Sequence, residues 1–598
     1  MSDAPPPVLS TRRQPLASVR LGWAVVLALA AGAALVAVAA TRRSQETPTD
    51  PPAPPAATPA PAVMNPLWPT ATSPEPREKR KIAAPELTGG VAWLNSAAPL
   101  WIHDSFNPLV ERPSLRGKIV LLDFWTLCCI NCIHNLPDLA KLHKKYANQL
   151  VVIGVHSPKF DSEKSTASIR KAILRYQIDH PVVNDANHAL WDKYECDAWP
   201  TLVLIDPEGN LYGYTTGEGN YELLDIVIGR LVEEHRQKKT LNETPLRFDL
   251  AKYRETATPL YFPGKVLADA KGKRLFIADS THHRLVVTDL TGKQQAVIGT
   301  GLPGKKDGKF DEAQFDDPQG MALRDNILYV ADRKNHSIRA VDLSAKTVTT
   351  VAGTGRQGEP EERRLNRPIP AKEIGLNSPW DLLIEGDKMY IALAGHHQIW
   401  VLDLKANTVM PYAGTGAETL RDGALRAACF AQPSGLASDG QRLFVADSET
   451  SSLRAVPLDP DARVQTLVGR GLFVFGDRDG PGRDGDEDSL TEARMQHALG
   501  VTYHDGKIYI ADTYNNKIKV YDLATHKLTT LLNGRPFGIF GPMLLNEPAG
   551  LSYADGKLYI ADTNSHRIVV WDINNRVFTP LKLTGVEPPR RPQEPINK

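Results

Sequence analysis

Cysteine is scarce in this chain, which has only five in 598 residues: Cys128, Cys129, Cys132, Cys196 and Cys429. Five cysteines are too few to hold a chain of this length together, so a disulfide scaffold is excluded. Three of them fall within five consecutive positions, which favours a chemical role. There is no second Cys-x-x-Cys pair beside the one at Cys129 and Cys132, which excludes a four-cysteine zinc site.

A surplus of charge of either sign is also missing, since 70 Lys and Arg stand against 69 Asp and Glu. Binding nucleic acid through its phosphates needs a basic surplus, so no nucleic-acid partner is expected. Hydrophobic residues make up 42% of the chain. Because single cores rarely grow past about 300 residues, this length predicts more than one domain.

One long hydrophobic run lies near the N-terminus, where residues 21–40 carry no charge and are almost wholly apolar. Twenty helical residues span about 30 Å, the thickness of a bilayer core. The balance of arginines around the run, including Arg20 before it and Arg42 after it, predicts that residues 1–20 are cytoplasmic. The run is therefore predicted to be a transmembrane helix or signal anchor, and a cleaved signal peptide ending near residues 37–39 is the alternative.

Both interpretations export the rest of the chain. We expect a bacterial-type inner-membrane protein that crosses the membrane once and has its globular domains in the periplasm. Residues 41–84 are rich in Pro, Ala and Thr, a composition typical of a semi-extended linker. This linker is expected to hold the first folded domain away from the membrane.

Residues 85–240 show apolar strands alternating with helices. A strand is predicted at 118–125, an amphipathic helix at 133–146, and further strands at 150–155 and 202–205. Such alternation predicts an α/β domain with a mostly parallel or mixed sheet. The cysteine cluster falls at the first junction between a strand and a helix.

Cys129 and Cys132 are spaced for thiol–disulfide exchange. Cys129 precedes the predicted helix, where unpaired backbone amides and the helix dipole favour a thiolate. Cys132 lies one turn further on, close enough to attack a mixed disulfide on Cys129. The alternatives are a structural pair of cysteines or a Cu(I) site completed by His134. Covalent haem is excluded because Ile133, instead of histidine, follows Cys132.

Residues 124–132, Phe-Trp-Thr-Leu-Cys-Cys-Ile-Asn-Cys, resemble the active-site segment of the thioredoxin superfamily, Phe-Trp-Ala-x-Trp-Cys-x-x-Cys. The resemblance implies that Cys129 is the nucleophile and Cys132 the resolving cysteine. It also implies that Asp123 is the buried carboxylate that assists proton transfer. Pro200, within Trp-Pro-Thr, resembles the cis-proline that lies beside the active-site sulfurs.

Two positions depart from that pattern or lie outside it. Cys128 stands where a tryptophan is usual, and it is either a third exchanging sulfur or an inert packing residue. Cys196 is predicted to be a lone core thiol, because free cysteine packs as a small hydrophobic residue.

The second half of the chain repeats itself. Six related segments, each an apolar strand such as Lys-Ile-Tyr-Ile-Ala-Asp, end at Asp279, Asp332, Leu393, Asp447, Asp512 and Asp562. Their spacing of 50 to 65 residues, with several short strands per unit, predicts an all-β six-bladed propeller over residues 250–585. The recurring aspartates are expected to accept hydrogen bonds from backbone amides in turns.

One position in the repeat is polar in every unit. It is occupied by His283, His336, His397, Ser451, Asn516 and His566. A ring of histidines around a channel could bind a metal ion, but turn stabilisation accounts for His, Ser and Asn alike. We therefore expect this position to be structural.

The repeat units resemble NHL repeats, and the order of the two modules resembles the NHL-repeat-containing protein 2 family. The chain is thus predicted to be multidomain, with an N-terminal transmembrane helix, a thioredoxin-like α/β domain at 85–240 and a propeller at 250–585.

The predicted function is thiol–disulfide exchange with protein thiols or disulfides, without a metal or cofactor. The expected partners are client proteins and a redox-recycling partner, bound by the propeller. The alternatives are a non-enzymatic propeller scaffold with a structural or copper-handling thiol site, and an enzyme housed in the propeller.

Overall fold

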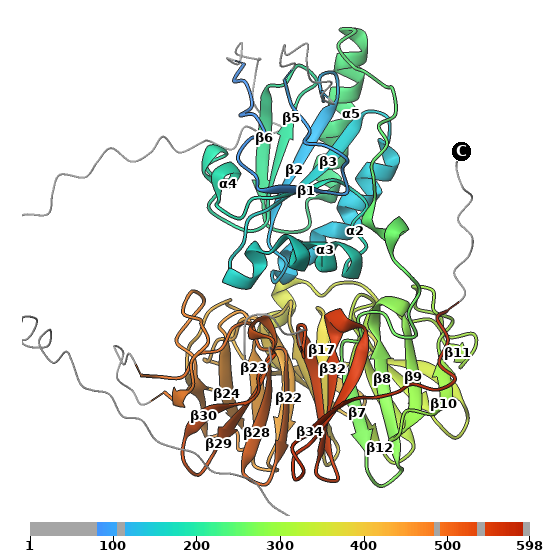
Figure 1. Ribbon diagram of the computed structural model, residues 1–598, viewed down its shortest axis with the longest axis vertical. Coiled ribbons are helices and arrows are strands. Elements are labelled where there is room, and N and C mark those ends of the chain that lie inside the picture. Colours follow the sequence, from blue (N-terminus) through green and yellow to red (C-terminus); the bar gives the residue numbers. More distant parts are fainter. Residues whose placement is uncertain (1–80, 104–113, 484–490, 535–543, 590–598) are drawn as a thin grey trace, which may run out of the picture. The chain divides into compact units, whose positions relative to one another are not determined.

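The computed structural model describes residues 81–103, 114–483, 491–534 and 544–589 (Figure 1). Residues 66–598 form one compact unit, to which all of these belong. The predicted segments 1–20 and 21–40, and nearly all of the 41–84 linker, lie outside the described residues. Within the described ranges, no helix combines the length and the apolar character that a bilayer crossing requires.

The first folded domain, called the redox domain below, is a six-stranded mixed sheet with helices packed on it. The strands are β1 (Ala92–Leu94), β2 (Ile119–Trp125), β3 (Leu150–His156), β4 (Val182–Asn184), β5 (Thr201–Ile205) and β6 (Leu211–Thr216), in the spatial order β1-β4-β3-β2-β5-β6. Strands β2, β3 and β4 are parallel, and β1, β5 and β6 pair antiparallel to their neighbours. The helices are α2 (Ile130–Lys145), α3 (Thr166–Arg175), α4 (Ala189–Lys193) and α5 (Tyr221–Gln237), with short 3-10 turns at Asp161–Lys164 and Ala251–Arg254.

Strand β2 lies in the middle of this sheet, and each of its residues is buried. Alternate residues of a strand point to opposite faces, so Ile119 and Leu121 enter the core beneath α2 and α5, whereas Val120, Leu122 and Phe124 enter the core on the other face. The predicted strand at 118–125 is therefore confirmed. The predicted helix at 133–146 begins three residues earlier, at Ile130, because Cys129 caps it.

The second domain is a ring of six β-sheets, one for each predicted repeat (Figure 1). Blade one contains β7 (Val266–Asp269), β8 (Arg274–Asp279), β9 (Arg284–Asp289) and β10 (Gln294–Ile298). Blade two contains β11 (Gly308–Lys309), β12 (Pro318–Arg324), β13 (Ile327–Asp332), β14 (Ser337–Asp342) and β15 (Thr347–Ala352). Blade three contains β16 (Ile369–Pro370), β17 (Pro379–Glu385), β18 (Lys388–Leu393), β19 (Gln398–Asp403) and β20 (Thr408–Ala413).

The remaining three blades follow the same plan. Blade four contains β21 (Gly423–Ala424), β22 (Pro433–Ser438), β23 (Arg442–Asp447), β24 (Ser452–Pro457) and β25 (Arg463–Val468). Blade five contains β26 (Gly480–Pro481), β27 (Gly500–His504), β28 (Lys507–Asp512), β29 (Lys517–Asp522) and β30 (Lys527–Leu532). Blade six contains β31 (Pro548–Ala554), β32 (Lys557–Asp562), β33 (Arg567–Asp572) and β34 (Val577–Pro580).

The ring closes on itself. The innermost strand of each blade lies against that of the next, and β31 of blade six lies against β7 of blade one. The C-terminal segment also joins blade one, since the Gln294 amide donates to the Thr584 carbonyl at 2.9 Å and the Thr584 amide donates to Gly292 at 2.9 Å. Closure of this kind covers sheet edges that would otherwise be open to pairing.

The recurring aspartates accept backbone hydrogen bonds, as predicted. Each takes the amide of the segment that leads into its own blade: Tyr261 to Asp279, Asp316 to Asp332, Ala431 to Asp447, Gln496 to Asp512 and Asn546 to Asp562, at 2.6 to 2.8 Å. Burial raises the pKa of Asp332, Asp447 and Asp512 to about 6, although a buried Arg or Lys lies beside each. These carboxylates are therefore structural.

The polar repeat position links neighbouring blades. Each residue at this position has a left-handed backbone, with φ between 46° and 56°. Its side chain accepts a hydrogen bond from a backbone amide of the following blade. The bonds run from Phe262 to His566, Asp317 to His283, Ser378 to His336, Gln432 to His397, His497 to Ser451 and Glu547 to Asn516. The structural role predicted for this position is confirmed.

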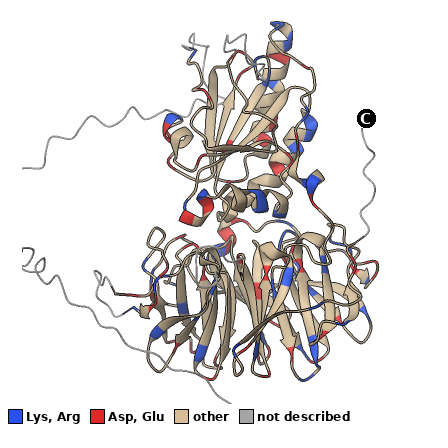
Figure 2. Ribbon diagram, viewed as in Figure 1, with Lys and Arg blue, Asp and Glu red and all other residues tan. Residues whose placement is uncertain are grey.

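Basic and acidic residues are interspersed along both domains (Figure 2).

Candidate functional site

Cys129 is the N-cap of α2, at the point where the chain turns from β2 into the helix. Its backbone is extended, with φ −75° and ψ 114°, and its Sγ accepts the Cys132 amide at 3.2 Å. An N-cap side chain normally supplies an oxygen acceptor to these unpaired amides. Here a sulfur takes that place, so the helix N-terminus and its dipole act directly on Cys129.

Cys132 lies one turn into α2 and is fully buried, whereas Cys129 is 9% exposed. Burial raises the pKa of Cys132 well above its ordinary value, and the neighbouring Cys129 and Asp123 raise it further. The two sulfurs therefore differ in kind. Cys129 is slightly exposed and has an amide donor, and Cys132 is a fully buried thiol.

Asp123 lies on β2 and is fully buried. Within the described part of the chain, neither of its carboxylate oxygens has a hydrogen-bond partner. Burial raises its pKa to about 8, so the group can hold or release a proton near neutral pH. The Asp123 carboxylate is among the groups that raise the pKa of Cys132.

The Trp199–Pro200 peptide bond is cis. The carbonyl oxygen of Trp199 lies 4.0 Å from the Sγ of Cys129. The Trp199 ring packs on Trp191 at 4.5 Å between centroids and donates its Nε1–H to the Ser157 carbonyl at 3.0 Å. The four predicted site residues Asp123, Cys129, Cys132 and Pro200 are thus brought together.

Cys128 is buried, and its amide donates to the Glu163 carboxylate at 3.0 Å. Burial, together with Glu163, raises the pKa of the Cys128 thiol well above its ordinary value. These surroundings favour the packing interpretation of Cys128. Cys196 is partly buried in the core on one face of the sheet, where burial likewise raises the pKa of its thiol.

His134 does not join the cysteines. Its Nδ1 pairs with Glu218 at 2.5 Å and its Nε2 with the Ser378 hydroxyl at 2.7 Å. In the described ranges the one group of three side chains spaced to hold a metal ion is Asp206, Glu208 and His235, which excludes the cysteine pair. The hydrogen bonds of His134 thus connect it to Glu218 and Ser378 and not to the cysteine pair.

Sequence reasoning missed the residues that the propeller contributes. The Ile130 amide, the first of α2, donates to the Gln432 side-chain oxygen at 3.1 Å. Lys159 forms an ion pair with Glu449, and Arg175 donates to Glu547 at 2.5 Å. No local pattern marks these residues, because each partner lies hundreds of positions away along the chain.

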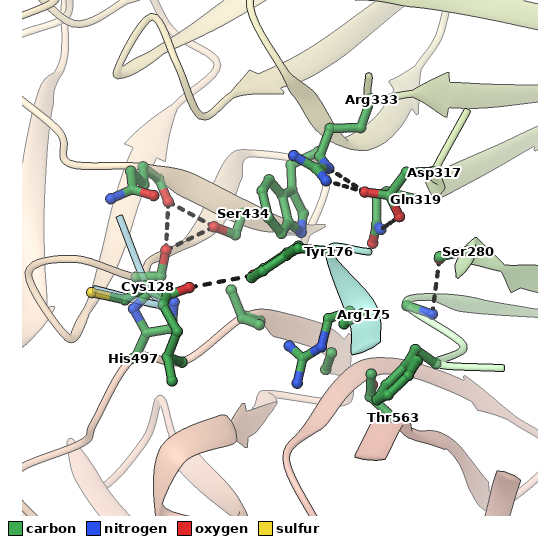
Figure 3. A pocket seen from close by; sticks show the side chains of 18 of the residues that line it. Cys128, Arg175, Tyr176, Ser280, Asp317, Gln319, Arg333, Ser434, His497 and Thr563 are labelled. Atoms are coloured by element: carbon green, nitrogen blue, oxygen red, sulfur yellow. Dashed lines mark hydrogen bonds and ion pairs between the residues drawn. The ribbon is translucent and has the colours of Figure 1, made fainter. Parts of the chain in front are cut away.

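A small cavity of about 40 Å³ remains between the two domains (Figure 3). Cys128, Arg175 and Tyr176 line it from the redox domain, and Ser434 and His497 are among the residues that line it from the propeller.

Comparison with known proteins places both domains. A family model described as thioredoxin-like matches residues 117–211, and one described as NHL repeat matches residues 315–340 and 545–571. The Homo sapiens NHL repeat-containing protein 2 is 40% identical over 508 residues, which cover 79% of this chain and 67% of that protein. The chain spans 64% of the length of the Gallus gallus protein of the same name.

Two further relatives match different extents of the chain. The Arabidopsis thaliana protein SUPPRESSOR OF QUENCHING 1, chloroplastic, is 40% identical over 468 residues, which cover 75% of this chain and 42% of that protein. The thiol-disulfide oxidoreductase YkuV of Bacillus subtilis is 30% identical over 151 residues, which cover 25% of this chain and 94% of that protein.

These relatives overturn the predicted location. A bacterial-type inner-membrane protein with periplasmic domains was expected, but three relatives that each match three quarters or more of the chain are two animal proteins and a plant protein described as chloroplastic. The prediction was wrong because a hydrophobic run between arginines specifies neither the cell type nor the compartment. With a thioredoxin-like domain, a six-bladed NHL propeller and this identity over most of its length, the chain belongs to the NHL repeat-containing protein 2 family.

Proposed function

We propose that the protein is a thiol–disulfide oxidoreductase in which Cys129 attacks and Cys132 resolves. The observation that carries the proposal is the N-cap geometry, in which the Cys129 sulfur accepts the Cys132 amide at the start of α2. A thiolate at this position is stabilised by the helix N-terminus, and the thiolate is the form that attacks disulfides. The 30% identity of the redox domain to an oxidoreductase of that class supports the same chemistry.

The reaction has two exchange steps. In the first, the Cys129 thiolate attacks one sulfur of a substrate disulfide, an S–S bond forms to Cys129, and the other substrate sulfur leaves as a thiolate. In the second, Cys132 gives its proton to Asp123 and attacks the Cys129 sulfur. The second substrate thiolate leaves, the Cys129–Cys132 disulfide forms, and the substrate has gained two electrons.

Asp123 has the properties that the second step requires. Burial raises the pKa of Cys132, so this thiol does not ionise readily without a base. A carboxyl group with a pKa of about 8 can accept that proton when it is ionised. The proposed clients are protein thiols or disulfides, and a separate redox partner would return the pair to the dithiol form.

The experiment that tests the proposal uses reduced protein and cystamine, a small disulfide. The unaltered protein should release both thiols of cystamine and form the Cys129–Cys132 disulfide. Cys132→Ser should stop after the first step and keep one cysteamine on Cys129, which mass spectrometry would locate. Cys196→Ser is the matched control and should react as the unaltered protein does. Persistence of the reaction in Cys129→Ser, or adducts on Cys196 alone, would contradict the assignment.

A further inference from the structure

The propeller covers the end of the redox domain that carries Cys129. Six residues that precede the innermost strands are called the docking ring here: Phe262, Asp317, Ser378, Gln432, His497 and Glu547. Each of them has left-handed backbone, with φ between 47° and 59°. Such backbone is strained for side chains other than glycine, and strain of this kind gathers at functional sites.

Five of the six residues of the docking ring contact the redox domain. Ser378 bonds His134 and Gln432 bonds the amide of Ile130, both on α2. The other contacts run from Glu547 to Arg175, from His497 to the Phe160 ring at 5.5 Å, and from Phe262 to Arg175 at 5.6 Å. Five of the six blades therefore hold the redox domain through the same repeat position.

Buried charges reinforce this contact. The side chains of Lys159 and Glu449 are 7% and 3% exposed. Burial alone would lower the pKa of Lys159, but the Glu449 carboxylate holds it above its ordinary value. Burial alone would raise the pKa of Glu449, but Lys159 holds it below. The pair is charged, and the loss of one partner would leave the other charge buried and uncompensated.

An apolar cluster surrounds the cysteines and continues into the propeller. It contains Cys128, Cys129 and Cys132 together with Tyr261, Phe262 and Tyr514. Phe160 is fully buried and packs edge-on against Phe475 at 4.7 Å and Tyr514 at 5.6 Å. The two domains thus share a core at the redox site.

The space left at this interface beside the cysteines is small. The cavity beside Cys128 has a volume of about 40 Å³, room for about three water molecules. Pockets that take up drug-sized ligands measure about 300 to 1,000 Å³. A larger cavity of about 630 Å³ beside α3 is lined by none of the cysteines. Cys129 itself is only 9% exposed, so the docked propeller leaves little of its surface within reach of an extended protein segment.

We infer that the propeller is an intramolecular cover that sets a size limit on the disulfides that reach Cys129. In the docked molecule only small thiols and disulfides exchange with Cys129, and a protein disulfide reaches it after the redox domain separates from the docking ring. This inference rests on the proposed function and specifies its substrate class in each of the two states.

The test compares two maleimides of one chemistry and two sizes, N-ethylmaleimide and maleimide on a 5-kDa polyethylene glycol. The protein carries Cys196→Ser and Cys429→Ser, and peptide mass spectrometry follows the modification of Cys129. Lys159→Glu places a carboxylate against Glu449 and should undock the domains. Lys145→Glu is the matched control, because it also places a carboxylate against a carboxylate, that of Asp225, but in an exposed pair within the redox domain.

We expect the rate with the large reagent, relative to the small one, to rise at least ten-fold in Lys159→Glu and to stay unchanged in Lys145→Glu. The double variant Lys159→Glu with Glu449→Lys exchanges the two charges and should restore the low ratio of the large-reagent rate to the small-reagent rate. Such a rescue would show that Lys159→Glu undocks the domains and does not misfold them. Equal rates of the two reagents in the protein with Lys159 and Glu449 intact would overturn the cover. Loss of the cystamine reaction would instead overturn the proposed function and leave the size ratio as a separate result.

Discussion

Replacement of Asp123 by asparagine should stabilise the redox domain, and more so as the pH rises. The carboxyl group is fully buried without a hydrogen-bond partner among the described residues, and burial raises its pKa from 3.8 to about 8. In the unfolded chain the same group ionises near its ordinary pKa. The folded state therefore binds more protons between these two values, and its stability falls as the pH rises through that window.

The size of the effect follows from the two pKa values. At pH 7 the folded domain keeps a neutral carboxyl that the unfolded chain would ionise, at a cost of about 4 kcal/mol. At pH 5 the same comparison gives about 2 kcal/mol. Asparagine has nearly the same shape and does not titrate, so Asp123→Asn should remove this pH-dependent cost.

The assay is hydrogen exchange of the peptide that spans β3, followed by mass spectrometry, because β3 pairs with β2 and reports the opening of this sheet alone. Asp123→Asn should slow exchange at pH 7 far more than at pH 5, after correction for intrinsic rates. Asp185→Asn is the matched control, since Asp185 is also fully buried but accepts the amides of Leu190 and Trp191 and the hydroxyl of Ser157.

Asp185→Asn should destabilise the domain by about 1–3 kcal/mol, because the side-chain NH2 of asparagine would face N–H and O–H donors and leave one of them without an acceptor. If Asp123→Asn instead destabilises the domain, or stabilises it equally at pH 5 and pH 7, the buried carboxyl is not the proton reservoir that the mechanism needs.

Two further predictions concern the propeller. Burial lowers the pKa of His397 to about 3, so blade linkage through its Nδ1 should weaken as the pH falls below about 6.5, by about 2 kcal/mol at pH 5. His397→Asn, which copies Asn516 at the same repeat position, should remove this acid dependence from exchange of the Gln432 amide; an unchanged dependence would contradict it. A protein that begins at residue 245 should fold, because the ring closes, but should bind hydrophobic dyes and self-associate through the uncovered Tyr261, Phe262, Phe475 and Tyr514. A monomer that binds no dye would show that these residues are not exposed.

Local signals in the sequence were enough for the redox motif and for the repeat. Residues 119–125 are apolar except for Asp123 because β2 is covered on both faces, so the strand was recognisable without knowledge of its partners. The aspartates that end the repeat strands were recognisable because the same backbone amide needs an acceptor in five of the six blades. The variation among His, Ser and Asn at the linking position was informative for the same reason, since all three offer an acceptor.

The cover over Cys129 could not be found in this way. Gln432 lies 302 positions from Ile130, and a glutamine before a proline has no distinctive pattern. The hydrophobic and charged residues of the docked face, such as Phe160 and Lys159, look in the sequence like ordinary surface residues of a helix-rich segment. These residues are buried because one face of the propeller packs against the redox domain, and a local sequence pattern does not indicate which face that is.

The repeat and the redox site are nevertheless connected by a short path. His397 accepts the amide of Gln432 at 3.2 Å, and the side chain of Gln432 accepts the amide of Ile130 at 3.1 Å. Ile130 is the first residue of α2 and follows the Cys129 cap. Gln432 has a left-handed backbone, and its hydrogen bond to His397 helps to hold that conformation. A single hydrogen bond, from the Ile130 amide, therefore connects Gln432 to the helix N-terminus that carries Cys129. The same helix N-terminus therefore serves both the propeller and the sulfur, since the Ile130 amide donates to Gln432 and the Cys132 amide donates to Cys129.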